Sequence, residues 1–221
     1  MDVRLLGVTP HPERLPALAA KLTHSNVSTD ELEQSTDKEL GTILDYVMKL
    51  GHTSVIEHTS FTFAISEVSR SLTHQLVRHR IASYAQQSQR YVNLEEPCFI
   101  TPPKITKDEE MKKAYDQTMR TIWDQYNQLL SLGIPAEDAR YVLPNAACTN
   151  IIVTMNARSL LNFFELRCCQ HAQWEIRMLA NKMLKLVKQK APRMFKDAGP
   201  PCQSKKYCPE HNPDCPLYPK K

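Results

Sequence analysis

The spacing of apolar residues constrains the fold of this chain more than any other feature, because it switches between two periods. The segment SFTFAIS, residues 60–66, alternates apolar and polar side chains, with Phe61 and Phe63 on one face, which is typical of a strand. From Val68 the apolar residues instead recur at helical spacing, with Leu72 one turn later. A chain that alternates between strand and helix patterns is expected to pack helices on a sheet.

Other segments repeat these two patterns along the chain. Capping-box patterns at Thr36 and Thr106 precede two apolar helices, which Gly51 and Gly133 are expected to end. The sequence also predicts strands at residues 3–9 and 150–156, an extended stretch at 89–94, and helices at about 12–24, 158–169 and 173–190.

Composition excludes several classes of protein. The chain has only five glycines, and no two lie close enough for a glycine-rich phosphate loop, so side chains and isolated backbone amides must hold any nucleotide. No apolar run is long enough to cross a membrane, and the N-terminal stretch lacks the apolar core of a signal peptide, so a cytoplasmic protein is expected. An odd count of seven cysteines favours reduced thiols or metal ligands over a disulfide framework.

The last thirty residues differ in kind from the rest of the chain. They contain seven of the fifteen prolines and three of the seven cysteines, so neither helix nor sheet is expected there. We predict one domain at residues 1–195 and a Pro- and Cys-rich tail at 196–221. The alternatives for the tail are free or partly oxidised thiols and a zinc site of Cys3His content, made by Cys202, Cys208, His211 and Cys215.

The segment RHRIASYAQQSQRY, residues 78–91, gathers cationic side chains and two serines without an acidic residue. Arginine presents a planar fork that binds phosphate or imide oxygens in pairs, and serine adds a hydroxyl donor. The segment is therefore a candidate anion receptor. The alternative is a solvated charged face, in which the arginines stabilise the C-terminal end of the preceding helix.

The same segment resembles the signature R-H-R-x-x-S-x-N-x-x-S-x-R of the flavin-dependent thymidylate synthases, with Ala85 where that signature often has asparagine. Further blocks resemble the same family in the same order. They are GHTSVIEHTSFTF at residues 51–63, EDARYVLP at 137–144 and NARSLLNFFELRCCQHAQWEI at 156–176. On these ordered blocks the chain is identified as a member of this family.

The resemblance implies a single α+β domain with a central, twisted, largely antiparallel sheet packed with long helices. It implies a methyltransferase that converts deoxyuridine monophosphate (dUMP) into deoxythymidine monophosphate (dTMP). The implied carbon donor is methylenetetrahydrofolate, and the implied hydride donor is FAD reduced by NADPH or NADH, without an enzymic nucleophile. Because the family contacts its ligands from different subunits, a homotetramer is expected.

The resemblance also implies residue roles. Flavin is expected to bind Ser54, Glu57, Arg78, His79, Arg80, Gln86, Asn156, Arg158 and Asn162. The nucleotide is expected to bind Gln75, Arg78, Gln86, Gln87, Ser88, Gln89, Arg90, Arg140 and Arg167. Read from the residues alone, Asn156 is also a natural helix N-cap, a role compatible with a flavin contact.

The resemblance also implies that Arg167 contacts the uracil ring, so Arg167 is the predicted catalytic residue. A guanidinium fixed there stabilises negative charge on the N3–C4 edge and activates C5. His52 is expected near the flavin and the folate, with no chemical role assigned. Ser88 is a third candidate for the catalytic site, with Arg167 and His52. It has no adjacent base in the sequence, so it suits phosphate binding better than nucleophilic attack.

Two other functions compete with this one. A nucleic-acid-binding module would use the basic segment and a zinc-binding tail, but a net charge of +4 and an aromatic content of 7% argue against it. A family member that binds both ligands without turnover would be consistent with Ala85, whereas Arg167, Ser88 and His52 argue for activity. We therefore expect neither a nucleic-acid nor a membrane partner.

Overall fold

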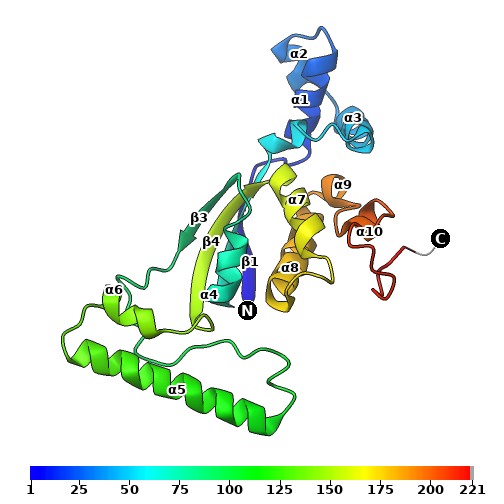
Figure 1. Ribbon diagram of the computed structural model, residues 1–221. Coiled ribbons are helices and arrows are strands. Elements are labelled where there is room, and N and C mark those ends of the chain that lie inside the picture. The colour runs from blue at the N-terminus through cyan, green and yellow to red at the C-terminus, as the bar shows by residue number, and fades with distance from the viewer. Residues whose placement is uncertain (220–221) are drawn as a thin grey trace. The chain divides into compact units, whose positions relative to one another are not determined.

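The computed structural model describes residues 1–219 and contains a four-stranded antiparallel sheet. Its strands are β1 (Asp2–Val8), β2 (Ser60–Ser69), β3 (Ala82–Gln86) and β4 (Cys148–Asn156). The strand order is β1-β2-β4-β3, so β2 and β4 are the central strands (Figure 1). The predicted α+β class with a largely antiparallel sheet is confirmed.

Alternation of side chains explains the two central strands. In β2, Phe61, Phe63 and Ile65 are buried, and the residues between them are partly exposed. In β4, Ile151 and Val153 are buried on either side of an exposed residue. One face of the sheet therefore supplies the apolar surface on which helices pack.

The chain divides into two compact units, and β2 and β4 contribute residues to both. Unit 1 comprises residues 1–2, 65–78 and 84–152. Unit 2 comprises residues 3–64 and 79–83 and the described residues from 153 onward.

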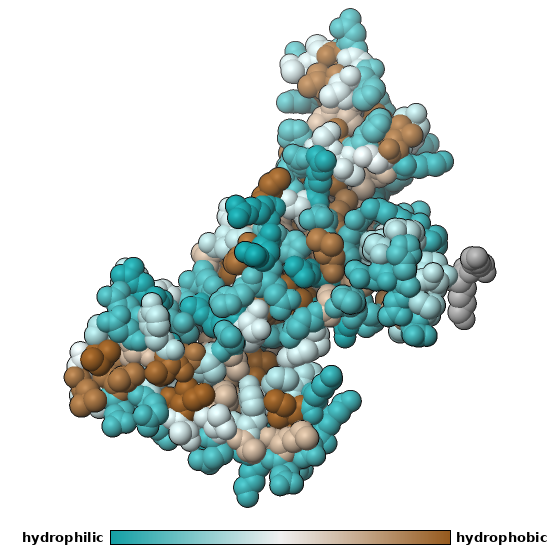
Figure 2. All heavy atoms as spheres, in the orientation of Figure 1, coloured by the Kyte–Doolittle hydropathy of each residue, from teal (hydrophilic) through white to brown (hydrophobic). Residues whose placement is uncertain are grey.

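Unit 1 contains the helices α4 (Arg70–Leu76), α5 (Glu109–Ser131) and α6 (Ala136–Ala139) and the 3-10 helix η2 (Arg140–Val142). Asp108, and not the predicted Thr106, is the N-cap of α5, because its carboxylate accepts a hydrogen bond from a first-turn backbone N–H at 2.9 Å. The buried Trp123 of α5 donates its indole N–H to the backbone oxygen of Leu94 at 2.8 Å. An apolar patch is exposed where α5 ends, next to α6 (Figure 2). Leu132, which directly follows α5, is 71% exposed.

Unit 2 contains the helices α1 (Arg14–His24), α2 (Thr29–Glu33), α3 (Asp37–Leu50), η1 (Val55–His58, a 3-10 helix), α7 (Ala157–Arg167), α8 (Trp174–Lys190), α9 (Pro192–Phe195) and α10 (Pro201–Ser204). Thr36 caps α3 by accepting a backbone hydrogen bond at 3.3 Å, and Gly51 ends the helix with a φ of 76°, a left-handed conformation that favours glycine. The core of this unit is partly aromatic. Phe195 packs edge-on against Phe61 and Phe164, with ring centroids 5.5 and 6.0 Å apart.

The structure corrects the sequence predictions in three places. Residues 89–94 were expected to be extended but contain turns, and the strand β3 lies upstream of them, inside the basic segment. Val68 still belongs to β2, and α4 begins two residues later. The last thirty residues were expected to lack helix but contain α9 and α10, because a proline in the first helical turn has no N–H that would need a partner.

Among the helices of residues 1–219, none is long and apolar enough to cross a membrane. The division of the chain at residue 195 stays a prediction.

Candidate active site

Helix α7 positions several predicted flavin residues of unit 2. Asn156 is its N-cap, because the side-chain oxygen accepts a hydrogen bond from the backbone N–H of Ser159 at 2.8 Å. The cap uses only that oxygen, so the amide N–H groups of Asn156 can still donate to a ligand. The Ser159 hydroxyl donates to the backbone oxygen of Ile81 at 3.0 Å and so holds the segment after Arg80 against α7.

Arg158 and Glu57 form an ion pair in unit 2. Arg158 Nη1 lies 2.5 Å from Glu57 Oε1, and both side chains are about half exposed. Helix η1, which carries Glu57, packs against α7. Asn162 is exposed one turn after Arg158 on α7, and Ser54 is exposed immediately before η1. These predicted flavin residues therefore lie on two packed elements.

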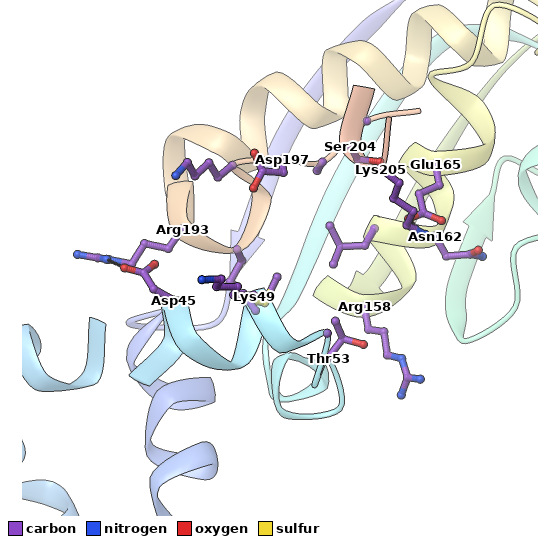
Figure 3. A pocket seen from close by; sticks show the side chains of 17 residues that line it. Asp45, Lys49, Thr53, Arg158, Asn162, Glu165, Arg193, Asp197, Ser204 and Lys205 are labelled. Atoms are coloured by element: carbon purple, nitrogen blue, oxygen red, sulfur yellow. Dashed lines mark hydrogen bonds and ion pairs between the residues drawn. The ribbon is translucent and has the colours of Figure 1, made fainter. Parts of the chain in front are cut away.

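A cavity of 770 Å³ in unit 2 is lined by Arg158 and Asn162 on one side and by Thr53 and Lys49 on another (Figure 3). Lys196 adds a further positive charge to its wall. The wall also contains two ion pairs, Asp45–Arg193 and Glu165–Lys205. The volume is within the range that holds a cofactor-sized ligand.

Arg167 and His79 are hydrogen-bonded to each other. Arg167 Nε donates to His79 Nε2 at 2.9 Å. His79 is only 6% exposed, and its ring packs edge-on against Phe163 with centroids 4.9 Å apart. Burial and, secondarily, the charge of Arg167 lower the pKa of His79 to about 4. His79 is therefore neutral near pH 7, and its Nε2 acts as the acceptor that orients the guanidinium plane.

The QQSQR loop, residues 86–90, belongs to unit 1 and is anchored at its start. Gln86 Nε2 donates to the Thr73 hydroxyl of α4 at 3.0 Å. The backbone N–H of Gln87 donates to the backbone oxygen of Asn150 in β4 at 2.9 Å, and the Asn150 amide donates back to Gln87 Oε1 at 3.2 Å. These bonds hold the loop between a helix and a strand.

The second half of the loop is anchored by charged side chains. Arg90 forms an ion pair with Glu137 at 2.8 Å, and its backbone N–H donates to the Ser88 hydroxyl oxygen at 3.1 Å. Arg70 Nη2 donates to Gln89 Oε1 at 2.9 Å. The sequence reasoning missed Arg70, because no block of the resemblance contains it and only the fold brings it to this loop.

The remaining predicted residues lie at element ends. Arg140 begins η2 and is half-buried, and its Nε donates to a backbone oxygen at 3.0 Å. Gln75 lies near the end of α4, and Arg78, two residues after the last residue of this helix, is exposed. His52 lies in an apolar groove of unit 2 made by α1 and α3, and it does not line the cavity that Arg158 lines.

The predicted ligand residues divide between the two units. Unit 1 contains most residues expected to bind the nucleotide: Gln75, Arg78, Gln86, Gln87, Ser88, Gln89, Arg90 and Arg140. Unit 2 contains Arg167 and most residues expected to bind flavin: Ser54, Glu57, His79, Arg80, Asn156, Arg158 and Asn162.

The four residues of the zinc alternative in the tail do not all line one cavity. Cys202, Cys208 and Cys215 line one small cavity of 280 Å³, together with Cys169, but His211 does not line it. His211 instead lies against Tyr207, with Nε2 3.4 Å from the tyrosine hydroxyl. Within residues 1–219 no group of three or more His, Cys, Asp or Glu side chains could hold a metal ion. The zinc alternative for the tail stays a prediction, and His211 is the member that does not join the three thiols at this cavity.

Fold and site together define an α+β protein with two clusters of arginine and amide side chains, suited to anionic ligands and lacking a glycine-rich loop. Residues 4–193 match the family described as Thymidylate synthase complementing protein, so the chain belongs to that family.

Two curated relatives and one solved structure extend this result. The chain is 52% identical to the flavin-dependent thymidylate synthase of Geobacter sulfurreducens, over 97% of this chain and 94% of that protein. It is 50% identical to the flavin-dependent thymidylate synthase of Clostridium tetani, over 97% of this chain and 93% of that protein. The fold is similar to that of the UMP/dUMP methylase PolB from Streptomyces cacaoi bound with 5-Br dUMP, with a TM-score of 0.76 and 24% identity over 88% of this chain and 93% of that one.

Proposed function

We propose that this chain is a flavin-dependent thymidylate synthase, a methyltransferase that converts dUMP into dTMP. The carbon donor is methylenetetrahydrofolate, and the hydride donor is FAD reduced by NADPH. The observation that carries this proposal is the family match over residues 4–193, together with relatives of that name at 52% and 50% identity.

Arg167 acts on the uracil ring in this proposal. His79 holds its Nε, which leaves the two Nη groups to face the N3–C4 edge of the base. A guanidinium fixed there stabilises the negative charge that develops on this edge and so makes C5 more nucleophilic. Because C5 itself attacks the one-carbon unit, no enzymic nucleophile is required. Ser88 then serves as a hydroxyl donor to the nucleotide phosphate.

The residues of unit 2 fit an anionic dinucleotide cofactor such as FAD. Arg158 lines a cavity of 770 Å³, and Glu57 holds its guanidinium in place through their ion pair. Asn156 and Asn162 supply amide donors, and Arg80 adds a second exposed cation. When bound, FAD supplies the hydride that completes the methyl group.

The phosphate of the nucleotide binds the QQSQR loop and Arg140 of unit 1. We further propose that the protein is a homotetramer, in which the two ligands of one site are contacted by different subunits. We place the enzyme in the cytoplasm.

The competing function is a nucleic-acid-binding module. Its support was the basic segment and the predicted zinc-binding tail, and the tail forms no metal site in the described chain. The arginines of the basic segment lie among amide side chains and do not form a stripe. A true nucleic-acid protein would show steep salt dependence of DNA binding, which we do not expect here.

The test is a visible absorption spectrum of the purified protein, reduced with NADPH and followed as substrates are added. We expect a flavin spectrum that bleaches on reduction and returns only when both dUMP and methylenetetrahydrofolate are present, with dTMP as product. A colourless protein that cannot be reconstituted with FAD would overturn the proposal.

A further inference from the structure

We propose that Arg70 is a further substrate-binding residue, which binds the phosphate of the nucleotide together with Arg140, beside the QQSQR loop. This inference rests on the proposed function, because it assumes that the loop binds a nucleoside monophosphate. No role follows for Arg70 from the sequence, since it precedes the basic segment by eight residues.

The contacts of Arg70 place its guanidinium at the loop. Its Nη2 donates to Gln89 Oε1 at 2.9 Å, and its Nη1 lies 3.5 Å from the backbone oxygen of Gln87. The backbone N–H of Arg70 donates to the backbone oxygen of Ala147 at 3.1 Å, which fixes the residue at the junction of β2 and α4. The guanidinium therefore contacts the residues on both sides of Ser88.

The charges around Arg70 are not balanced. The side chain is half-buried, and burial lowers the pKa of Arg70, with the nearby charge of Arg140 lowering it further. In residues 1–219 neither arginine forms an ion pair, since Glu137, the acid near Arg140, pairs with Arg90. Two close, partly desolvated cations without a carboxylate partner repel each other, and a bound anion would remove this repulsion.

A phosphate monoester matches this arrangement. It carries a charge close to −2 and three strong acceptor oxygens, so it can pair with two guanidinium groups at once. Arg70 has further N–H donors besides the group that bonds Gln89, and the Ser88 hydroxyl proton can complete the set. A deoxynucleoside without phosphate would gain nothing from Arg70.

The substitution Arg70→Gln tests this role, because glutamine removes the charge and keeps a polar side chain. We expect its KM for dUMP to rise roughly 10- to 100-fold, as for loss of a hydrogen bond to a charged group, with little change in kcat. The activity on deoxyuridine, which lacks the phosphate, should stay at the wild-type level. Arg140→Gln should behave in the same way, and Arg120→Gln, at an exposed residue of α5, is the matched control.

Three outcomes are decisive. An unchanged KM for dUMP in Arg70→Gln would overturn the inference. Equal losses on dUMP and deoxyuridine would also overturn it, because Arg70 would then only hold the loop in place. If the wild-type protein forms no dTMP, the proposed function fails, and calorimetry with inorganic phosphate then decides the inference separately: binding that is weaker in Arg70→Gln than in wild type supports it, and equal binding refutes it.

Discussion

Replacement of His79 by phenylalanine would isolate the contact that orients Arg167. Phenylalanine keeps an aromatic ring against Phe163 but removes the acceptor for Arg167 Nε, now 2.9 Å away. A hydrogen bond to a charged group contributes about 1.5–3 kcal/mol. If this contribution is expressed in the transition state, the loss corresponds to a roughly 10- to 150-fold lower rate of dTMP formation.

The assay is single-turnover oxidation of reduced flavin at saturating dUMP and methylenetetrahydrofolate, with dTMP measured directly. We expect the rate to fall while the KM for dUMP changes little, because Arg167 remains present but is poorly oriented. His79→Gln is the matched control, since its side-chain oxygen can accept the same hydrogen bond and should recover part of the rate. A His79→Phe enzyme that turns over at the wild-type rate would refute this reasoning. Loss of bound flavin with an unchanged rate in the flavin-loaded fraction would also refute it.

Three further predictions follow from the same structure. Arg167→Ala should abolish dTMP formation with flavin still bound, and turnover near the wild-type level would contradict its catalytic role. Stability should fall as the pH drops from about 6.5 to about 4, by up to about 3 kcal/mol from His79, because the unfolded chain takes up that proton first. Denaturant melts should show this contribution in wild type and not in His79→Phe, and equal pH dependence in the two proteins would contradict the assignment. Glu57→Gln should weaken FAD affinity by releasing Arg158 from its ion pair, measured by fluorescence titration, and an unchanged affinity would exclude this positioning role.

Local sequence patterns were sufficient for many of the secondary-structure elements. Period-two alternation predicted β2, and a strand predicted at residues 150–156 corresponds to most of β4. The cap at Thr36 with the stop at Gly51 predicted both ends of α3. These signals depend on neighbours within about one helical turn or along one strand, so they can be read without the fold. The short strand β3 was missed because its five residues ASYAQ carry little apolar alternation.

The tail shows where composition misleads. Prolines and cysteines suggested an irregular zinc-binding segment, but proline in the first turn permits helices as short as α9 and α10. The cysteine spacing allowed a Cys3His site, whereas the turns of the folded tail direct His211 to Tyr207. Spacing gives the content of a possible site, and only the backbone path decides which side chains meet.

The sequence by itself determined the ordered blocks that identify the family, the class of fold and the identity of Arg167 as the catalytic candidate. The tertiary structure alone decided that Arg167 meets His79, which lies 88 positions away, and that Arg70 meets the QQSQR loop. Contacts at such separations depend on how β2, β4 and α7 pack, which no local pattern encodes. The charges were visible in the sequence, but their partners and their protonation are properties of the folded chain.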